Sequence, residues 1–149
     1  MSSVAKTLSI LIPVYNEKST IVELLRRVEA APLPLSKQII IVDDGSTDGT
    51  RELLRQVEAA WGDDPDNRLC IVFQERNAGK GAAIRTGIAQ ASGDITLIQD
   101  ADLEYDPTDY PQLIAPIVSG QAEVVFGSRF LSGPHRVLFF RHSMGNRLL

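Results

Sequence analysis

The chain has 149 residues, a length typical of one domain, and we predict a single domain over residues 1–149. Hydrophobic residues make up 44% and charged residues 23%, which excludes a disordered or fibrous protein. The net charge of -4, without a basic stripe, argues against a nucleic-acid partner. The start shows no signal-peptide pattern, and no apolar run approaches the roughly 20 residues of a membrane span. The single cysteine, Cys70, cannot form an internal disulfide, which fits the cytoplasmic setting that we expect.

Apolar runs alternate with amphipathic segments along the chain. Near-continuous apolar runs predict buried strands, and apolar residues at helical spacing predict helices between them. In chain order we predict a strand at 8–14, a helix at 20–31, a strand at 38–42, a helix at 50–61, a strand at 69–73, a helix at 81–91, a strand at 95–98, a helix at 110–118 and a strand at 124–126. This alternation predicts an α/β fold, with a doubly wound, mostly parallel sheet and helices on both faces.

Polar residues gather directly after each predicted strand. These polar segments lie at residues 13–17, 43–49, 75–81, 100–104 and 127–129. The carboxyl ends of parallel strands meet at one edge of a sheet, and ligands bind beyond that edge. We therefore expect the five segments to form one ligand site.

The segment Asp100-Ala101-Asp102 follows the fourth predicted strand. Two carboxylates at this spacing can approach one cation, and Mg²⁺ or Mn²⁺ prefers oxygen ligands while keeping positions open for phosphate. The alternative is an ordinary solvated acidic turn, but the position of this segment after a buried strand favours the metal site.

Three further segments offer ligand contacts. Either Asp43 or Asp44 can accept a hydrogen bond from a base or a ribose, while residues 46–48 shape the turn that follows. The segment at 77–81 lacks the glycine and the Ser or Thr of a Walker A loop, so Lys80 is either a phosphate ligand or a solvated charge. Arg129 can bind a diphosphate through its planar guanidinium group, or it is a surface charge.

These motifs together resemble the family-2 glycosyltransferases of the GT-A fold, and among them the dolichyl-phosphate and polyprenyl-phosphate mannose or glucose synthases. The resemblance extends from about Leu8 to Arg129. It is carried by the segments Ile12-Pro13-Val14-Tyr15-Asn16-Glu17, Val42-Asp43-Asp44-Gly45-Ser46-Thr47-Asp48-Gly49-Thr50, Asn77-Ala78-Gly79-Lys80-Gly81, Asp100-Ala101-Asp102-Leu103-Glu104 and Gly127-Ser128-Arg129.

The resemblance implies an inverting enzyme that moves a hexose from a nucleotide sugar, GDP-mannose or UDP-glucose, to an acceptor. It also implies roles for particular residues. By resemblance, Pro13, Tyr15 and Glu17 line the base and ribose pocket, Asp43 or Asp44 binds the nucleoside, Asp100 and Asp102 hold the metal and the diphosphate, and Arg129 and Arg141 contact phosphate. Asp100, Asp102 and Arg129 are thus the expected catalytic residues.

The acceptor implied by the resemblance is a polyprenyl phosphate. A lipid phosphate is largely dianionic at pH 7 and needs no general base, whereas a saccharide hydroxyl would need one such as Glu104 or Asp106. Relatives usually continue beyond this point, so we expect a truncated chain. Its missing C-terminal part would bind the acceptor and contact the cytoplasmic face of the membrane. A fragment that binds nucleotide sugar without turnover is a further alternative.

Two other classes with similar folds fit less well. A receiver-type signalling domain would carry its acidic pair after the first strand, where this chain has Pro13-Val14-Tyr15. A dinucleotide-binding oxidoreductase would carry Gly-x-Gly-x-x-Gly at the same place, and that motif is absent.

Overall fold

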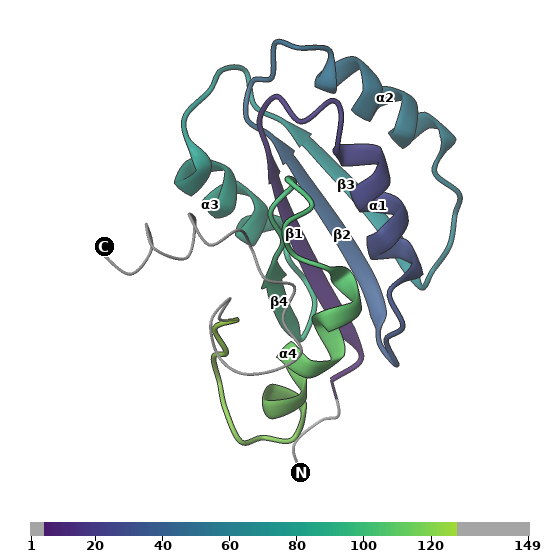
Figure 1. Cartoon of the computed structure of the whole chain (residues 1–149), viewed down its shortest axis with the longest axis vertical. Helices are drawn as coiled ribbons and strands as arrows, with labels where there is room; N and C mark the ends of the chain where they lie inside the picture. Colours follow the sequence, from purple (N-terminus) through teal and green to yellow (C-terminus); the bar gives the residue numbers. More distant parts are fainter. Residues whose placement is uncertain (1–4, 128–149) are drawn as a thin grey trace, which may run out of the picture.

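A computed structural model describes residues 5–127 and has a parallel sheet at its centre (Figure 1). The sheet order is β3-β2-β1-β4. The strands are β1 (Thr7–Val14), β2 (Ser36–Asp43), β3 (Asn67–Phe73) and β4 (Ile95–Ile98). Each lies where the sequence predicts a strand, with ends that differ by no more than two residues.

The helices also form where the apolar spacing predicts them. They are α1 (Ile21–Ala30), α2 (Thr50–Ala60), α3 (Lys80–Gln90) and α4 (Tyr110–Val118), with a short 3-10 helix, η1 (Pro107–Asp109), before α4. Pro111 is tolerated in the first turn of α4, because a backbone N–H there has no partner within the helix. Among residues 5–127, no helix has the length and apolar character needed to cross a bilayer.

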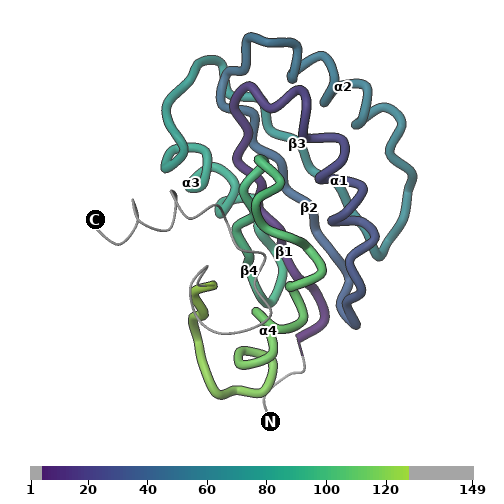
Figure 2. The backbone as a smooth tube through the Cα atoms, viewed as in Figure 1, coloured from purple at the N-terminus to yellow at the C-terminus, as the bar shows by residue number. Residues whose placement is uncertain are grey.

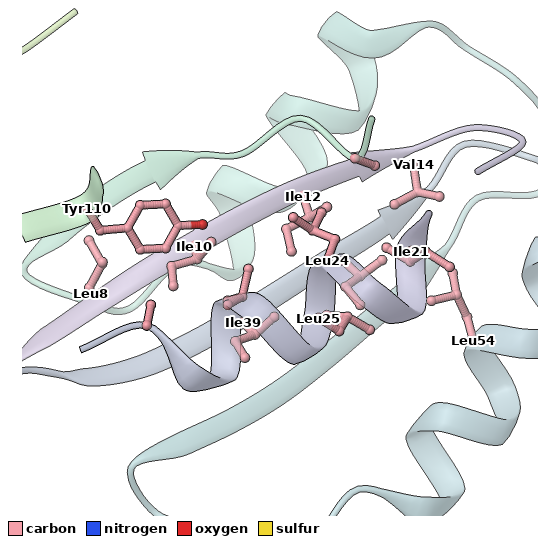
Figure 3. Packing of buried hydrophobic residues seen from close by; sticks show 14 of the residues in the cluster. Leu8, Ile10, Ile12, Val14, Ile21, Leu24, Leu25, Ile39, Leu54 and Tyr110 are labelled. Atoms are coloured by element: carbon pink, nitrogen blue, oxygen red, sulfur yellow. The ribbon is translucent and has the colours of Figure 1, made fainter. Parts of the chain in front are cut away.

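The sheet is covered on both faces, as predicted. On one face, alternate residues of β1 such as Ile10 and Ile12 pack against α1, Leu54 of α2 and Tyr110 of α4 (Figure 3). On the other face, Leu11 packs with residues of β2 and with α3. Residues 10 to 12 of β1 are fully buried because helices cover both sides, which explains why the run lacks polar alternation.

The order in which the strands are added to the sheet changes direction, with β1 as the switch point. It passes from β1 to β2 and β3 on one side, then returns to place β4 on the other side of β1 (Figure 2). β1 pairs in parallel with both neighbours, so Leu11 lies opposite Ile40 on β2 and Ile98 on β4. The loops that follow β1 and β4 therefore diverge from a switch point, where doubly wound sheets bind ligands.

The predicted strand at residues 124–126 is wrong. The described segment there has no regular structure, and it pairs with none of the four strands. Val124 and Phe126 are 66% and 90% exposed. An apolar run becomes a strand only when a neighbour takes its backbone hydrogen bonds, and residues 5–127 provide no such neighbour for it.

We predict that Gly87→Ala destabilises the fold. An added Cβ at Gly87 would lie 1.7 Å from Cδ1 of Leu11, so the buried Leu11 side chain or α3 would have to shift. Overpacking of this kind should lower the free energy of unfolding by about 1–3 kcal/mol, measured by urea denaturation.

Gly81→Ala is the matched control in the same helix. Its Cβ would meet only the side chain of Arg85, at 3.7 Å. The free energy of unfolding should stay the same or rise by up to about 1 kcal/mol. Equal losses in the two variants would show that the close approach at Gly87 is unimportant.

Candidate donor-binding site

A hollow of about 280 Å³ lies at the carboxyl edge of the sheet. The loops after all four strands contribute to its wall. Its lining residues are Pro13, Val14, Tyr15, Glu17, Asp44, Asn77, Gly79, Lys80, Ala83, Asp100, Ala101 and Asp102. The described loops thus meet at one edge, as the strand order predicts.

Seven of the ten candidate site residues line this hollow: Pro13, Tyr15, Glu17, Asp44, Lys80, Asp100 and Asp102. Asp43 does not line it. Arg129 and Arg141 lie outside the described residues.

The two neighbouring carboxylates after β2 face different partners. Asp43 is fully buried, and its Oδ2 lies 2.9 Å from Nε of Arg51 on α2. Asp44 accepts backbone hydrogen bonds from Ala78 at 2.8 Å and from Gly79 at 2.9 Å. Of the two residues left open by the sequence, Asp44 is therefore the one at the hollow.

Asp44 can hold the loop after β3 because Gly45 lets that loop come close. Gly45 has a φ of +76°, and a Cβ there would lie 2.5 Å from the backbone nitrogen of Asn77. Only glycine fits both the backbone conformation and the space. The buried charge of Asp44 is stabilised by two N–H donors from the neighbouring loop.

The loop after β1 is joined to the loop after β2. Ser46 Oγ accepts from the backbone of Asn16 at 2.9 Å, and Asn16 Oδ1 accepts from the backbone of Thr47 at 2.8 Å. Glu17 accepts from the Thr20 hydroxyl at 2.7 Å, so it also supports the start of α1. Tyr15 is 46% exposed and lines the hollow, where its ring can stack on a planar ligand.

The acidic turn after β4 is ordered by its own polar groups. Asp102 Oδ1 accepts from the backbone of Glu104 at 3.0 Å, and Leu103 has a left-handed φ of 65°. Lys80 Nζ lies 2.5 Å from Asp100 Oδ1. Because both members of this pair are partly exposed, it contributes little to stability, but it shows that a cation can reach Asp100 inside the hollow.

The residues fit a hard divalent cation that is shared with a ligand. Asp100 and Asp102 both line the hollow, and their oxygens suit Mg²⁺ or Mn²⁺. Within the described part of the chain, no group of three or more His, Cys, Asp or Glu side chains could hold a metal ion alone. A metal here would therefore take its remaining ligands from a diphosphate and from water.

A larger hollow, of about 560 Å³, lies at the opposite edge of the sheet. It is bordered by residues 33–37 and by Asp66 and Asn67. Lys37 there donates to the carbonyl of Glu29 at 2.6 Å, and burial lowers the pKa of its ammonium group. This edge carries the amino ends of the strands, so the smaller hollow is the better ligand site despite its size.

Some contributors to the site were not predicted from the sequence. Asn77 lines the hollow, although no role was predicted for its side chain. Gln99 was not considered, yet it is buried directly before Asp100. A glutamine at the end of an apolar strand gives no signal that its amide is buried.

The switch-point hollow and its acidic turn define a doubly wound α/β ligand-binding domain. Residues 9–148 match the family described as "Glycosyl transferase family 2", and the chain belongs to this family. This match confirms the resemblance noted in the motifs.

Curated relatives share up to about two fifths of the aligned residues. An undecaprenyl-phosphate 4-deoxy-4-formamido-L-arabinose transferase of Aeromonas hydrophila is 41% identical over 117 residues, covering 77% of this chain and 35% of the relative. The protein of that name from Pseudomonas aeruginosa is 41% identical over 114 residues, covering 75% and 32%. The chain spans about a third of the length of these relatives.

Solved glycosyltransferase structures have the same fold, which confirms the predicted GT-A architecture. A mannosyltransferase from Pyrobaculum calidifontis, in complex with GDP-Man and Mn²⁺, is 31% identical with a TM-score of 0.59, over 72% of this chain and 30% of that one. Glucosyl-3-phosphoglycerate synthase from Mycobacterium tuberculosis, in complex with Mn²⁺, UDP-Glc and phosphoglyceric acid, is 27% identical with a TM-score of 0.58, over 78% and 41%.

We predict that Asp44→Asn loosens the loop after β3. Asparagine offers one acceptor oxygen in place of two, so the N–H of Ala78 or Gly79 would face an NH₂ group. Amide hydrogen exchange at these two residues should become faster, and the free energy of unfolding should fall by about 1–3 kcal/mol. Asp63→Asn, at an exposed position far from the hollow, should change neither quantity. Unchanged exchange in Asp44→Asn would contradict this role.

Proposed function

We propose that this chain binds the nucleotide-sugar donor of an inverting glycosyltransferase that transfers a hexose or related sugar to a polyprenyl phosphate. The observation that carries the proposal is the hollow at the β1–β4 switch point, which Asp100 and Asp102 line together with Gly79 and Lys80. Membership of the glycosyltransferase family supports it.

In this proposal the nucleoside lies over the loops after β1 and β2. Tyr15 offers an exposed ring on which a base can stack, and Pro13 adds apolar wall. Asp44 offers a carboxylate that already accepts two N–H groups and retains acceptor capacity for a base N–H or a ribose hydroxyl. Glu17 lines the same end and keeps the loop in place through Thr20.

The diphosphate in this proposal lies between the loops after β3 and β4. A bound Mg²⁺ or Mn²⁺ would neutralise charge that develops on the departing nucleoside diphosphate. Asp100 and Asp102 would hold that ion, and Lys80 would turn from Asp100 toward the phosphate oxygens. The structures of similar proteins with Mn²⁺ and a nucleotide sugar support the use of a divalent ion.

The acceptor in this proposal is a polyprenyl phosphate. Relatives at 41% identity are named as transferases to undecaprenyl phosphate, which supports a lipid phosphate. Such a phosphate attacks as an anion and needs no general base. A saccharide hydroxyl is the alternative acceptor, and it would need a carboxylate such as Glu104 or Asp106 as base. The roles of Arg129 and Arg141 and a peripheral location at the cytoplasmic membrane face stay predictions.

The donor site is tested by calorimetric titration of the chain with UDP, GDP and their sugars, with and without Mn²⁺. We expect one nucleotide to bind only when Mn²⁺ is present. Asp102→Asn should weaken this binding at least tenfold, because it removes one anionic ligand of the ion.

Asp63→Asn is the matched control, since it also replaces one exposed carboxylate but lies outside the hollow. It should bind like the wild type. If the folded wild-type chain bound no nucleotide, or if Asp102→Asn bound as tightly as Asp63→Asn, the proposed donor site would be wrong.

A further inference from the structure

We infer that Gln99 and Tyr110 are positioning residues of the donor site, which hold the turn at residues 100–105 so that Asp100 and Asp102 face one cation. The inference rests on the proposed function and adds to it two buried side chains that do not line the hollow. Four hydrogen bonds carry it: two join the Gln99 side chain to the turn, and two fix Gln99 itself to β1 and to α4.

Gln99 is fixed to the sheet by its backbone and to the turn by its side chain. Its N–H donates to the carbonyl of Leu11 at 2.9 Å, which continues the pairing of β1 beyond the end of β4. Its side-chain Nε2 donates to the carbonyl of Asp100 at 2.9 Å and to that of Tyr105 at 3.3 Å. Both amide hydrogens are therefore used, and they join the beginning of the turn to its end.

Tyr110 completes the connection from the helix side. Its hydroxyl donates to Oε1 of Gln99 at 2.7 Å, and the two residues are 1% and 2% exposed. Burial, together with the nearby charge of Asp106, raises the pKa of the Tyr110 hydroxyl, so the group stays a donor at physiological pH. Since Tyr110 occupies the Oε1 acceptor, the amide cannot flip without placing an oxygen against two carbonyl groups.

The turn needs such support because its backbone is strained. Leu103 has a φ of 65°, which a side-chain-bearing residue adopts at a cost, and the bond from Glu104 to Asp102 is exposed at the surface. Without Gln99 the two carboxylates would sample many separations, and a metal would have to order them on binding. Groups that orient metal ligands typically change metal affinity by 10- to 100-fold when they are removed.

A purely structural role makes a different prediction. If Gln99 and Tyr110 only filled the core, their replacement would lower stability without a specific effect on the turn or on metal binding. Ser9 is a suitable comparison, because it is also fully buried and hydrogen-bonded, to Gln38 at 2.6 Å and to Gly93 at 2.9 Å. It lies toward the amino end of β1, whereas the acidic turn follows the carboxyl end of β4.

The experiment compares Tyr110→Phe, Gln99→Met and Ser9→Ala with the wild-type chain. Amide hydrogen exchange over residues 100–106 reports the order of the turn in the free protein. The Mn²⁺ concentration at half-saturation, in the presence of UDP and separately of GDP, reports ligand positioning. Thermal melting reports stability, and Tyr110→Phe, which loses one hydroxyl, keeps the test valid if Gln99→Met does not fold.

We expect faster amide exchange in the turn in both Tyr110→Phe and Gln99→Met. The Mn²⁺ concentration at half-saturation should rise by about tenfold in Tyr110→Phe and by more in Gln99→Met. Ser9→Ala should show neither change. Unchanged exchange in the turn would overturn the inference, as would faster exchange with an unchanged Mn²⁺ midpoint. Failure of the folded wild type to bind Mn²⁺ with either nucleotide would contradict the proposed function instead, and the exchange data would still decide whether the two side chains hold the turn.

Discussion

The structure depends above all on the parallel pairing of β1 with strands on both of its sides. β1 pairs with β2 along its full length and with β4 through residues 8–11. Both neighbouring strands therefore end near the carboxyl end of β1. The order β3-β2-β1-β4 then forces the chain to reverse its path across the sheet between β3 and β4. The loops after β1, β2 and β4 owe their positions to this pairing, and the loop after β3 is placed by the pairing of β3 with β2. A slip of one residue in either pairing would exchange the two faces of a strand.

Negative charge is concentrated at the same edge, and neighbouring donor groups offset the free-energy cost of burying it. Asp43 is paired with Arg51, whose guanidinium group also lies 5.4 Å from the ring centre of Phe73 and donates to the carbonyl of Gln74. Asp44 is stabilised by backbone N–H groups rather than by a side-chain cation. Replacing Arg51 would leave the buried carboxylate of Asp43 without its charged partner, and removal of one member of such a pair is strongly destabilising.

Four of the five strands and all four helices were predicted correctly, because each has a clear apolar pattern. The prediction failed at residues 124–126, since apolar character does not reveal whether a pairing partner exists. The position of the hollow was predicted from the rule that ligands bind beyond the carboxyl ends of strands. The choice between Asp43 and Asp44 could not be predicted, because side-chain direction at a strand end depends on tertiary contacts. The role of Gln99 could not be predicted for the same reason. Its amide is buried and hydrogen-bonded only because Tyr110, from a later helix, packs against it.

Paramagnetic broadening by Mn²⁺, measured on the amide signals of the isotope-labelled chain with nucleotide present, tests the location of the donor site most directly. We expect broadening to centre on residues 100–104 and to extend to residues 77–80, with weaker effects at residues 13–17, because these loops surround the carboxyl-edge hollow. Signals of residues 33–37, beside the larger hollow at the opposite edge, should stay sharp. Broadening centred on that opposite edge would contradict a donor site at the carboxyl edge.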